Sequence, residues 1–162
     1  LATGSAFTNV AAWPTTRAEL AFYNGEPSNG KSYVIDAAWF VSLTSIVAAA
    51  SVTLIYQVGF PTAIAAADDD TAQLINSSMG RTYNGRARRD TAVLSMTANK
   101  WAVLGSSGPS ATASIGHGVH AEVNGGVIVP PGATIGLNAI VGTALGTSLI
   151  GVAWSELQLD LA

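Results

Sequence analysis

Hydrophobic and polar residues alternate along several short stretches of this chain, a pattern typical of β-strands with one buried face. Residues 17–23 (RAELAFY) show the pattern first, with Leu20 and Phe22 on one face and Glu19 and Tyr23 on the other. The alternation predicts a first strand in this stretch.

Runs rich in β-branched and aromatic residues predict further strands. Residues 32–44 place Trp39, Val41 and Leu43 on one face, with a change of register near Asp36. Turn-forming residues, including two Asn-Gly pairs in 24–31 and the Gly/Ser-rich 105–110, predict loops between the runs. The other expected strands are 52–60, 89–97, 101–104, part of 111–123, 127–129, 133–141 and 147–159.

The sequence Val129-Pro130-Pro131-Gly132 is the clearest turn signal in the C-terminal part of the chain. A residue before proline is extended, and Pro131-Gly132 suits the centre of a type II turn, where glycine supplies the positive φ. We therefore expect a corner between two sheets here.

The last predicted strand, 147–159, is apolar on both faces, which predicts cover by a second sheet on one side and by a neighbouring subunit on the other. One face carries Ile150, Val152 and Trp154, and the other carries Leu149, Gly151 and Ala153.

These elements predict an all-β protein: an antiparallel two-sheet sandwich, in particular a jelly roll. Eight to ten short strands separated by glycine and proline turns are typical of this class. A parallel sheet would require strands that alternate with helices, and the sequence shows no such alternation. Residues 1–16 are expected to form an extended arm, and 17–162 a single domain. At most one or two short helices are expected, one of them within 61–75.

The amino-acid composition adds the expectation that this protein assembles with other subunits. Only 10% of the 162 residues are charged and 49% are hydrophobic, whereas about 25% of an ordinary domain is charged. Contact with other subunits would cover apolar surface that so few charges leave exposed. The net charge of −3 does not favour nucleic acid, and no apolar run is long enough to span a membrane.

The candidate interface residues form three groups: an arginine cluster, an aspartate run and two aromatic residues of the N-terminal arm. Arginine forks and an aspartate run can pair within a subunit or between subunits, and a solvated face is the simpler alternative. The aromatic side chains are expected to anchor the arm to its own domain or to a neighbour. The residues are Arg81, Arg86, Arg88, Arg89, Asp68, Asp69, Asp70, Phe7 and Trp13.

No catalytic, cofactor or metal residues are predicted. His120 and Glu122 would share a strand face while His117 points the other way, so the three do not form a metal site. The aspartate run lacks the spacing of a calcium loop. There is no Gly-x-Ser-x-Gly motif and no cysteine.

Four segments together resemble the jelly-roll structural proteins of bacteriophage virions, such as decoration (cement) proteins and related trimeric head or tail components. They are Leu20 to Tyr23 with Asn24-Gly25, Lys31 to Ile35, Val127 to Gly132, and Leu149 to Glu156 with Trp154. The resemblance implies a non-enzymatic virion protein that forms a homo-oligomer, in particular a trimer, and contacts other capsid or virion proteins. It transfers no individual functional residue.

Three alternatives remain open at this point. A major capsid protein is a variant of the same hypothesis. A lectin-like or host-attachment module would use exposed aromatic rings, with Trp39, Trp101 and Tyr83 as candidates. A cupin-like metalloenzyme would centre on His120 and Glu122.

Overall fold

Nine β-strands make up the regular structure of the residues that the computed structural model describes, and no helix occurs among these residues. The described residues are 5–6, 18–43, 51–60, 83, 85–90, 101–108, 118–141 and 147–159. The strands are β1 (Ser5–Ala6), β2 (Leu20–Asn24), β3 (Ser32–Ser42), β4 (Val52–Phe60), β5 (Ala87–Asp90), β6 (Ala102–Ser107), β7 (Gly118–Val129), β8 (Thr134–Val141) and β9 (Thr147–Leu157).

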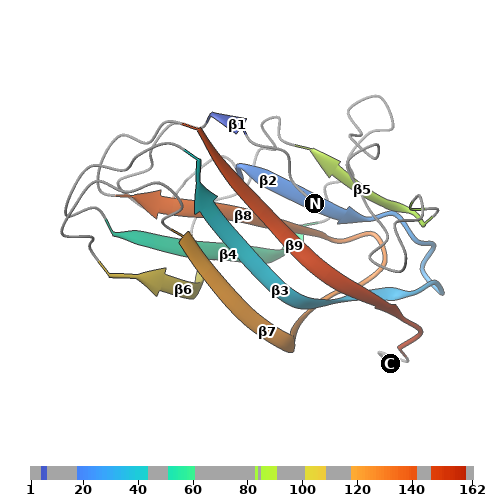
Figure 1. Cartoon of the computed structure of the whole chain (residues 1–162). Helices are drawn as coiled ribbons and strands as arrows, with labels where there is room; N and C mark the ends of the chain where they lie inside the picture. The colour runs from blue at the N-terminus through green and yellow to red at the C-terminus, as the bar shows by residue number, and fades with distance from the viewer. Residues whose placement is uncertain are drawn as a thin grey trace.

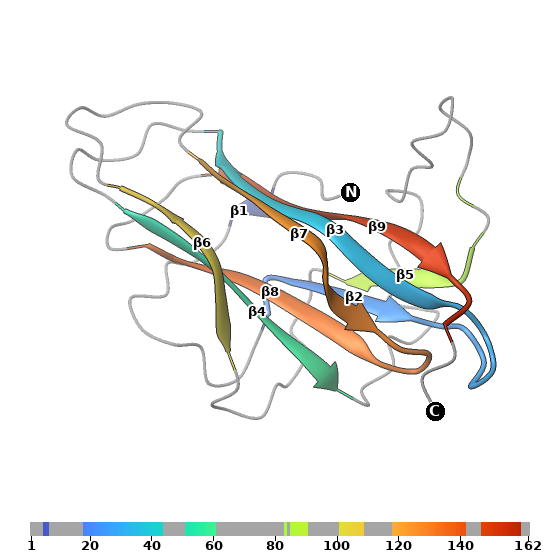
Figure 2. The same cartoon turned by 90° about the horizontal axis from the view of Figure 1, so that it is seen from below.

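The strands form two antiparallel sheets packed face to face. One has the order β1-β9-β3-β7 and the other the order β5-β2-β8-β4-β6. In Figure 1 the first sheet lies in front of the second, and Figure 2 shows the two layers from the side. The predicted all-β sandwich is confirmed.

The strand order is that of a jelly roll. From β1 to β4, successive strands alternate between the two sheets, and the first strand, β1, pairs with the last, β9. The second strand pairs with the second-to-last, β2 with β8, which gives the two interlocked Greek keys of this fold. The additional strand β5 extends the five-stranded sheet beside β2.

Part of the sequence prediction falls outside the described residues. The expected helix within 61–75 does so entirely. Of the arm predicted over 1–16, only Ser5–Ala6 is described, and it pairs with β9 at Thr147 and Ser148.

The core lies between the sheets and follows the predicted alternation. Leu20 and Phe22 point inward from β2, and Ile150 and Val152 point inward from β9. Along β3 the buried positions change parity at Asp36, where the register shifts against both neighbouring strands, as the sequence predicts. The main core residues are Leu20, Phe22, Tyr33, Ile35, Ala38, Phe40, Val52, Leu54, Ile135, Leu137, Ala139, Ile150 and Val152.

The structure corrects the prediction at β7, which is one strand of twelve residues. The sequence predicts a break at Gly125–Gly126, but the chain remains paired with β3 on both sides of it. Asn124 and Gly125 have φ angles of 49° and 77°, so the strand forms a bulge opposite Asp36 instead of ending.

The predicted loop over 105–110 is also wrong in part, because β6 continues through Ser107. Gly105, Ser106 and Ser107 pair with Leu54, Thr53 and Val52 of β4. Ladder hydrogen bonds to β4 therefore outweigh the weak strand propensity of glycine and serine.

The predicted corner after β7 is confirmed. Gly132 has a φ angle of 78°, and the Ala133 amide donates to the Pro130 carbonyl at 3.0 Å, which closes the turn. The turn carries the chain from the four-stranded sheet to β8 of the five-stranded sheet. The Gly132 amide also donates to the Asn24 carbonyl, at 2.8 Å.

The side chain of Asn24 joins the two sheets at this corner. Asn24 ends β2 in the five-stranded sheet and is 0% exposed. Its Nδ2 donates to the carbonyls of Val129, at the end of β7, and of Lys31, directly before β3, each at 2.9 Å. Its Oδ1 accepts from the Glu26 amide at 3.0 Å, which shapes the loop between β2 and β3.

Replacing Asn24 with alanine is expected to destabilise the fold by about 2–4 kcal/mol, because it leaves buried carbonyls without donors. Urea unfolding monitored by tryptophan fluorescence measures the loss. Asn29→Ala is the matched control, since its exposed side chain lies in the same loop. Equal midpoints for the two variants would contradict the bridging role.

Candidate functional site

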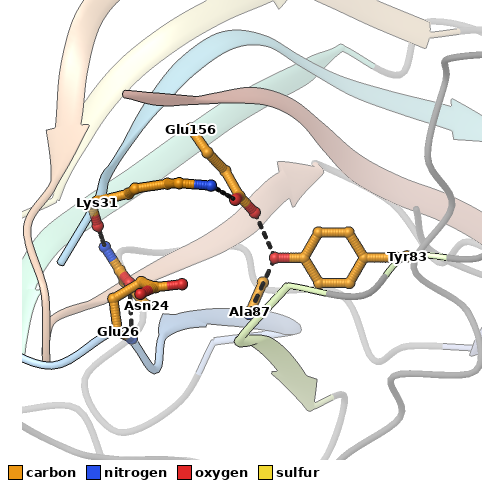
Figure 3. A network of polar contacts seen from close by, with 6 residues as sticks. All are labelled: Asn24, Glu26, Lys31, Tyr83, Ala87 and Glu156. Carbon is orange, nitrogen blue, oxygen red and sulfur yellow. Dashed lines mark hydrogen bonds and ion pairs between the residues drawn. The ribbon is translucent and has the colours of Figure 1, made fainter. Parts of the chain in front are cut away.

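A polar network extends from the Asn24 corner to the end of β9 (Figure 3). The Tyr83 hydroxyl donates to Glu156 Oε1 at 2.5 Å and accepts from the Ala87 amide at 3.1 Å. Lys31 Nζ lies 3.4 Å from Glu156 Oε2. The Lys31 side chain is 52% exposed, so this ion pair adds little stability. The tyrosine contact instead connects β9 to the segment before β5.

An aromatic cluster supports this network from the core side. The Trp154 ring centroid lies 4.5 Å from that of Phe22 and 5.6 Å from that of Tyr83, which it meets edge-on. A side chain at Gly85 would overlap the Tyr83 ring. The chain passes close to Tyr83 there because residue 85 is glycine.

Burial keeps both tyrosines of the network in the neutral form. It is the largest cause of the raised pKa of Tyr83, and the hydrogen bond to Glu156 raises that pKa further. Burial also raises the pKa of Tyr33, whose hydroxyl lies beside Tyr83 and the Arg86 backbone without a hydrogen bond of normal geometry. The network is therefore a packed structural connection and offers no ionised phenol for chemistry.

The predicted arginine cluster does not lie on one surface. Arg86 is exposed and Arg88 is half-buried, whereas Arg89 is 1% exposed. Arg89 shares the buried face of β5 with Ala87, opposite Phe22 of β2. Arg89 has an interaction within the chain. The other candidate interface residues, Arg81, Asp68, Asp69, Asp70, Phe7 and Trp13, lie outside the described residues.

His120 and Glu122 share a face of β7, as predicted, and both are exposed. That face is the outer one, because the neighbouring residues Val119, which precedes His120, and Ala121, which lies between His120 and Glu122, are buried toward the core. A cupin-like site inside the sandwich therefore receives neither side chain. The described ranges hold no group of three or more His, Cys, Asp or Glu residues placed to bind a metal, and His117 falls outside them.

On the outer face of the four-stranded sheet, the part formed by β3 and β9 is mainly apolar and Trp39 is its largest side chain, while His120 and Glu122 of β7 and the hydrogen-bonded Asp36 and Ser155 border it. Trp39 lies between His120 of β7 and Gly151 of β9 in the ladder. A Cβ at Gly151 would come within 2.7 Å of the Trp39 ring, so the indole lies directly on the glycine. We call this surface the tryptophan face; it consists of Val34, Trp39, Val41, Leu149, Gly151 and Ala153.

The two outer faces of the sandwich differ. On the five-stranded sheet, the outward positions Ile55, Gln57 and Asn138 of β4 and β8 are buried. On the tryptophan face the side chains are half-buried or exposed, and Leu43 and Leu157 at its borders are 45% and 47% exposed. The tryptophan face is thus an apolar sheet surface that this chain leaves accessible.

Comparison with known proteins does not assign this site. No known protein family, curated protein or solved structure matches the chain. Within the described part of the chain, no helix has the length and apolar character needed to cross a membrane.

The raised tyrosine pKa values predict a loss of stability in alkali. Unfolded tyrosine ionises near pH 10, and Tyr33 and Tyr83 ionise at higher pH when folded. Their contribution is therefore complete below about pH 10 and decreases above it, by up to about 1.4 kcal/mol per pH unit for each tyrosine.

Urea unfolding between pH 8 and pH 11 tests this. Tyr83→Phe should be less stable than the natural chain at pH 8, because Glu156 Oε1 loses its donor and the Ala87 amide loses its acceptor. The variant should also lose less stability as the pH rises. Parallel pH profiles for the two proteins would show that Tyr83 does not contribute.

Proposed function

We propose that this protein is a non-enzymatic structural subunit of a virion that assembles with copies of itself and with other virion proteins. The observation that carries the proposal is a jelly-roll fold with one apolar outer face, the tryptophan face. Jelly rolls are common in viral shells, but they also form lectins and cupins, so the fold alone does not select a function.

The tryptophan face supports assembly because its composition suits contact with protein. Val41 and Leu149 form a cross-strand pair on it, beside the pair of Trp39 and Gly151. Burying apolar surface contributes about 25 cal/mol per Å², and a stable contact covers roughly 800 Å² on each partner. Flat apolar strands of this kind can supply the centre of such a contact.

A trimer is the oligomer that we propose, in the role of a decoration protein or a related head or tail component. The low charge of the whole chain fits this role, since 10% charged residues leave little polar surface to keep subunits apart. A closed ring of three copies would cover one apolar patch on each copy.

Val41→Lys is expected to lower the oligomeric mass, because it places a charge in the centre of the tryptophan face. Light scattering coupled to size-exclusion chromatography measures the mass at about 50 µM protein. Val103→Lys is the control, since Val103 is 54% exposed on β6 of the other sheet. A natural chain that is monomeric, or two variants with the same mass, would contradict assembly through this face.

Carbohydrate binding is the second candidate, and the position of Trp39 favours it. An indole held flat on Gly151 can stack on the C–H face of a sugar ring, and the neighbouring His120 can hydrogen-bond its hydroxyls. This would make the protein a lectin-like or host-attachment module.

The carbohydrate hypothesis predicts that a glycan array gives specific signals that Trp39→Ala removes. Trp101→Ala should retain them, because Trp101 precedes β6 in the other sheet. A blank array with the natural chain would reject this candidate and leave the assembly proposal in place.

A further inference from the structure

Strand β7 forms an open edge of the four-stranded sheet. Among the described strands it pairs only with β3, and Figure 1 shows it at the border of the sheet. An edge strand presents unpaired amide and carbonyl groups that another strand can bind. Charged side chains often protect such edges, and β7 carries two ionisable side chains, His120 and Glu122, both exposed.

The spacing of these two residues makes the edge complementary to itself. If two β7 strands pair antiparallel about a twofold axis at Ala121, residues equally distant from Ala121 lie opposite each other. His120 of one copy then faces Glu122 of the other, twice in each dimer, and Val119 faces Val123. The imidazole of one copy can donate a hydrogen bond to the carboxylate of the other, whereas two carboxylates placed opposite each other are destabilising.

Charge selects this register over its neighbours. A twofold axis at Glu122 would place the two Glu122 carboxylates opposite each other, and an axis at His120 would pair the two histidines. A shift by one residue would place outward His120 against inward Ala121, which the alternation of faces forbids. The bulge also limits the pairing, since the positive φ of Asn124 interrupts the regular strand geometry after Val123.

We propose that two copies of this chain associate by antiparallel pairing of their β7 strands about a twofold axis at Ala121, with His120 opposite Glu122 of the partner. The proposal rests on the proposed function, for which it names one contact between copies. Trimers closed through the tryptophan face are finite, whereas a separate twofold contact would link trimers into an extended shell.

Charge reversal in two separate variants tests the register. His120→Glu places glutamate opposite Glu122, and Glu122→Lys places lysine opposite His120. Each variant alone should therefore dimerise about 10-fold more weakly than the natural chain. A mixture of the two variants should recover near-natural affinity, because each mixed dimer pairs the introduced glutamate with the introduced lysine and keeps one contact of His120 with Glu122. Native mass spectrometry with one variant mass-tagged distinguishes mixed dimers from like dimers.

A single cysteine gives an independent readout, because the natural chain has none. Ala121→Cys places the two sulfurs across the twofold axis, where paired strands bring Cα atoms to about 4.5–5.5 Å, within disulfide range. Mild oxidation should give a covalent dimer. Ser28→Cys, exposed in the loop between β2 and β3 and outside both proposed contacts, is the control and should not cross-link at the same rate.

The outcomes separate this contact from the proposed function. Recovery in the mixture together with Ala121→Cys cross-linking supports the β7 contact. No weakening in either variant, no recovery in the mixture, or a monomeric natural chain at about 100 µM overturns it. If Val41→Lys disrupts assembly while the β7 variants do not, the shell role stands without the β7 contact. If the β7 dimer forms and Val41→Lys has no effect, the β7 contact stands without the tryptophan face.

Discussion

The buried amide of Asn24 determines how the two sheets meet at one end of the sandwich. Hydrophobic burial holds the sheets together but has no direction, so it does not fix their relative position. The Asn24 side chain supplies that direction with two donated hydrogen bonds and one accepted one, to the carbonyls of Lys31 and Val129 and the amide of Glu26. The turn at Gly132, the start of β3 and the network of Tyr83 and Glu156 all lie beside it. The corner is therefore positioned by one fully satisfied polar group.

The two outer surfaces of the sandwich have different roles in the chain. The outward residues of β4 and β8 are buried within the chain, so that face contributes to stability. The tryptophan face is still accessible, and Gly151 keeps it nearly flat by letting the Trp39 ring lie on the backbone. A flat apolar surface on a rigid sheet loses little entropy when a partner covers it. This asymmetry, more than the fold class, is what supports the proposal that copies of the chain assemble.

The sequence pattern predicted the parts of the fold that depend on local alternation. It assigned the faces of the strands around Leu20, Ile150 and His120 correctly, and it located the bulge at Asp36 and the corner at Gly132. It failed where pairing with a distant strand determines the local structure. At Gly125 pairing with β3, and at Gly105 pairing with β4, continues a strand through residues that favour turns. The contact of Tyr83 with Glu156 joins residues 73 positions apart, so the local sequence around either residue does not predict it. The inward direction of Arg89 likewise depends on pairing with β2.

The position of the last two strands has a consequence for synthesis of the protein. β8 lies between β2 and β4, and β9 lies between β1 and β3, so the C-terminal strands fill the centres of both sheets. In a nascent chain that lacks β8 and β9, β2 cannot be joined to β4, and β1 cannot be joined to β3, so neither sheet is complete. Both sheets can therefore be completed only after residues 134–157 have left the ribosome, and a prematurely terminated chain lacks the complete sandwich.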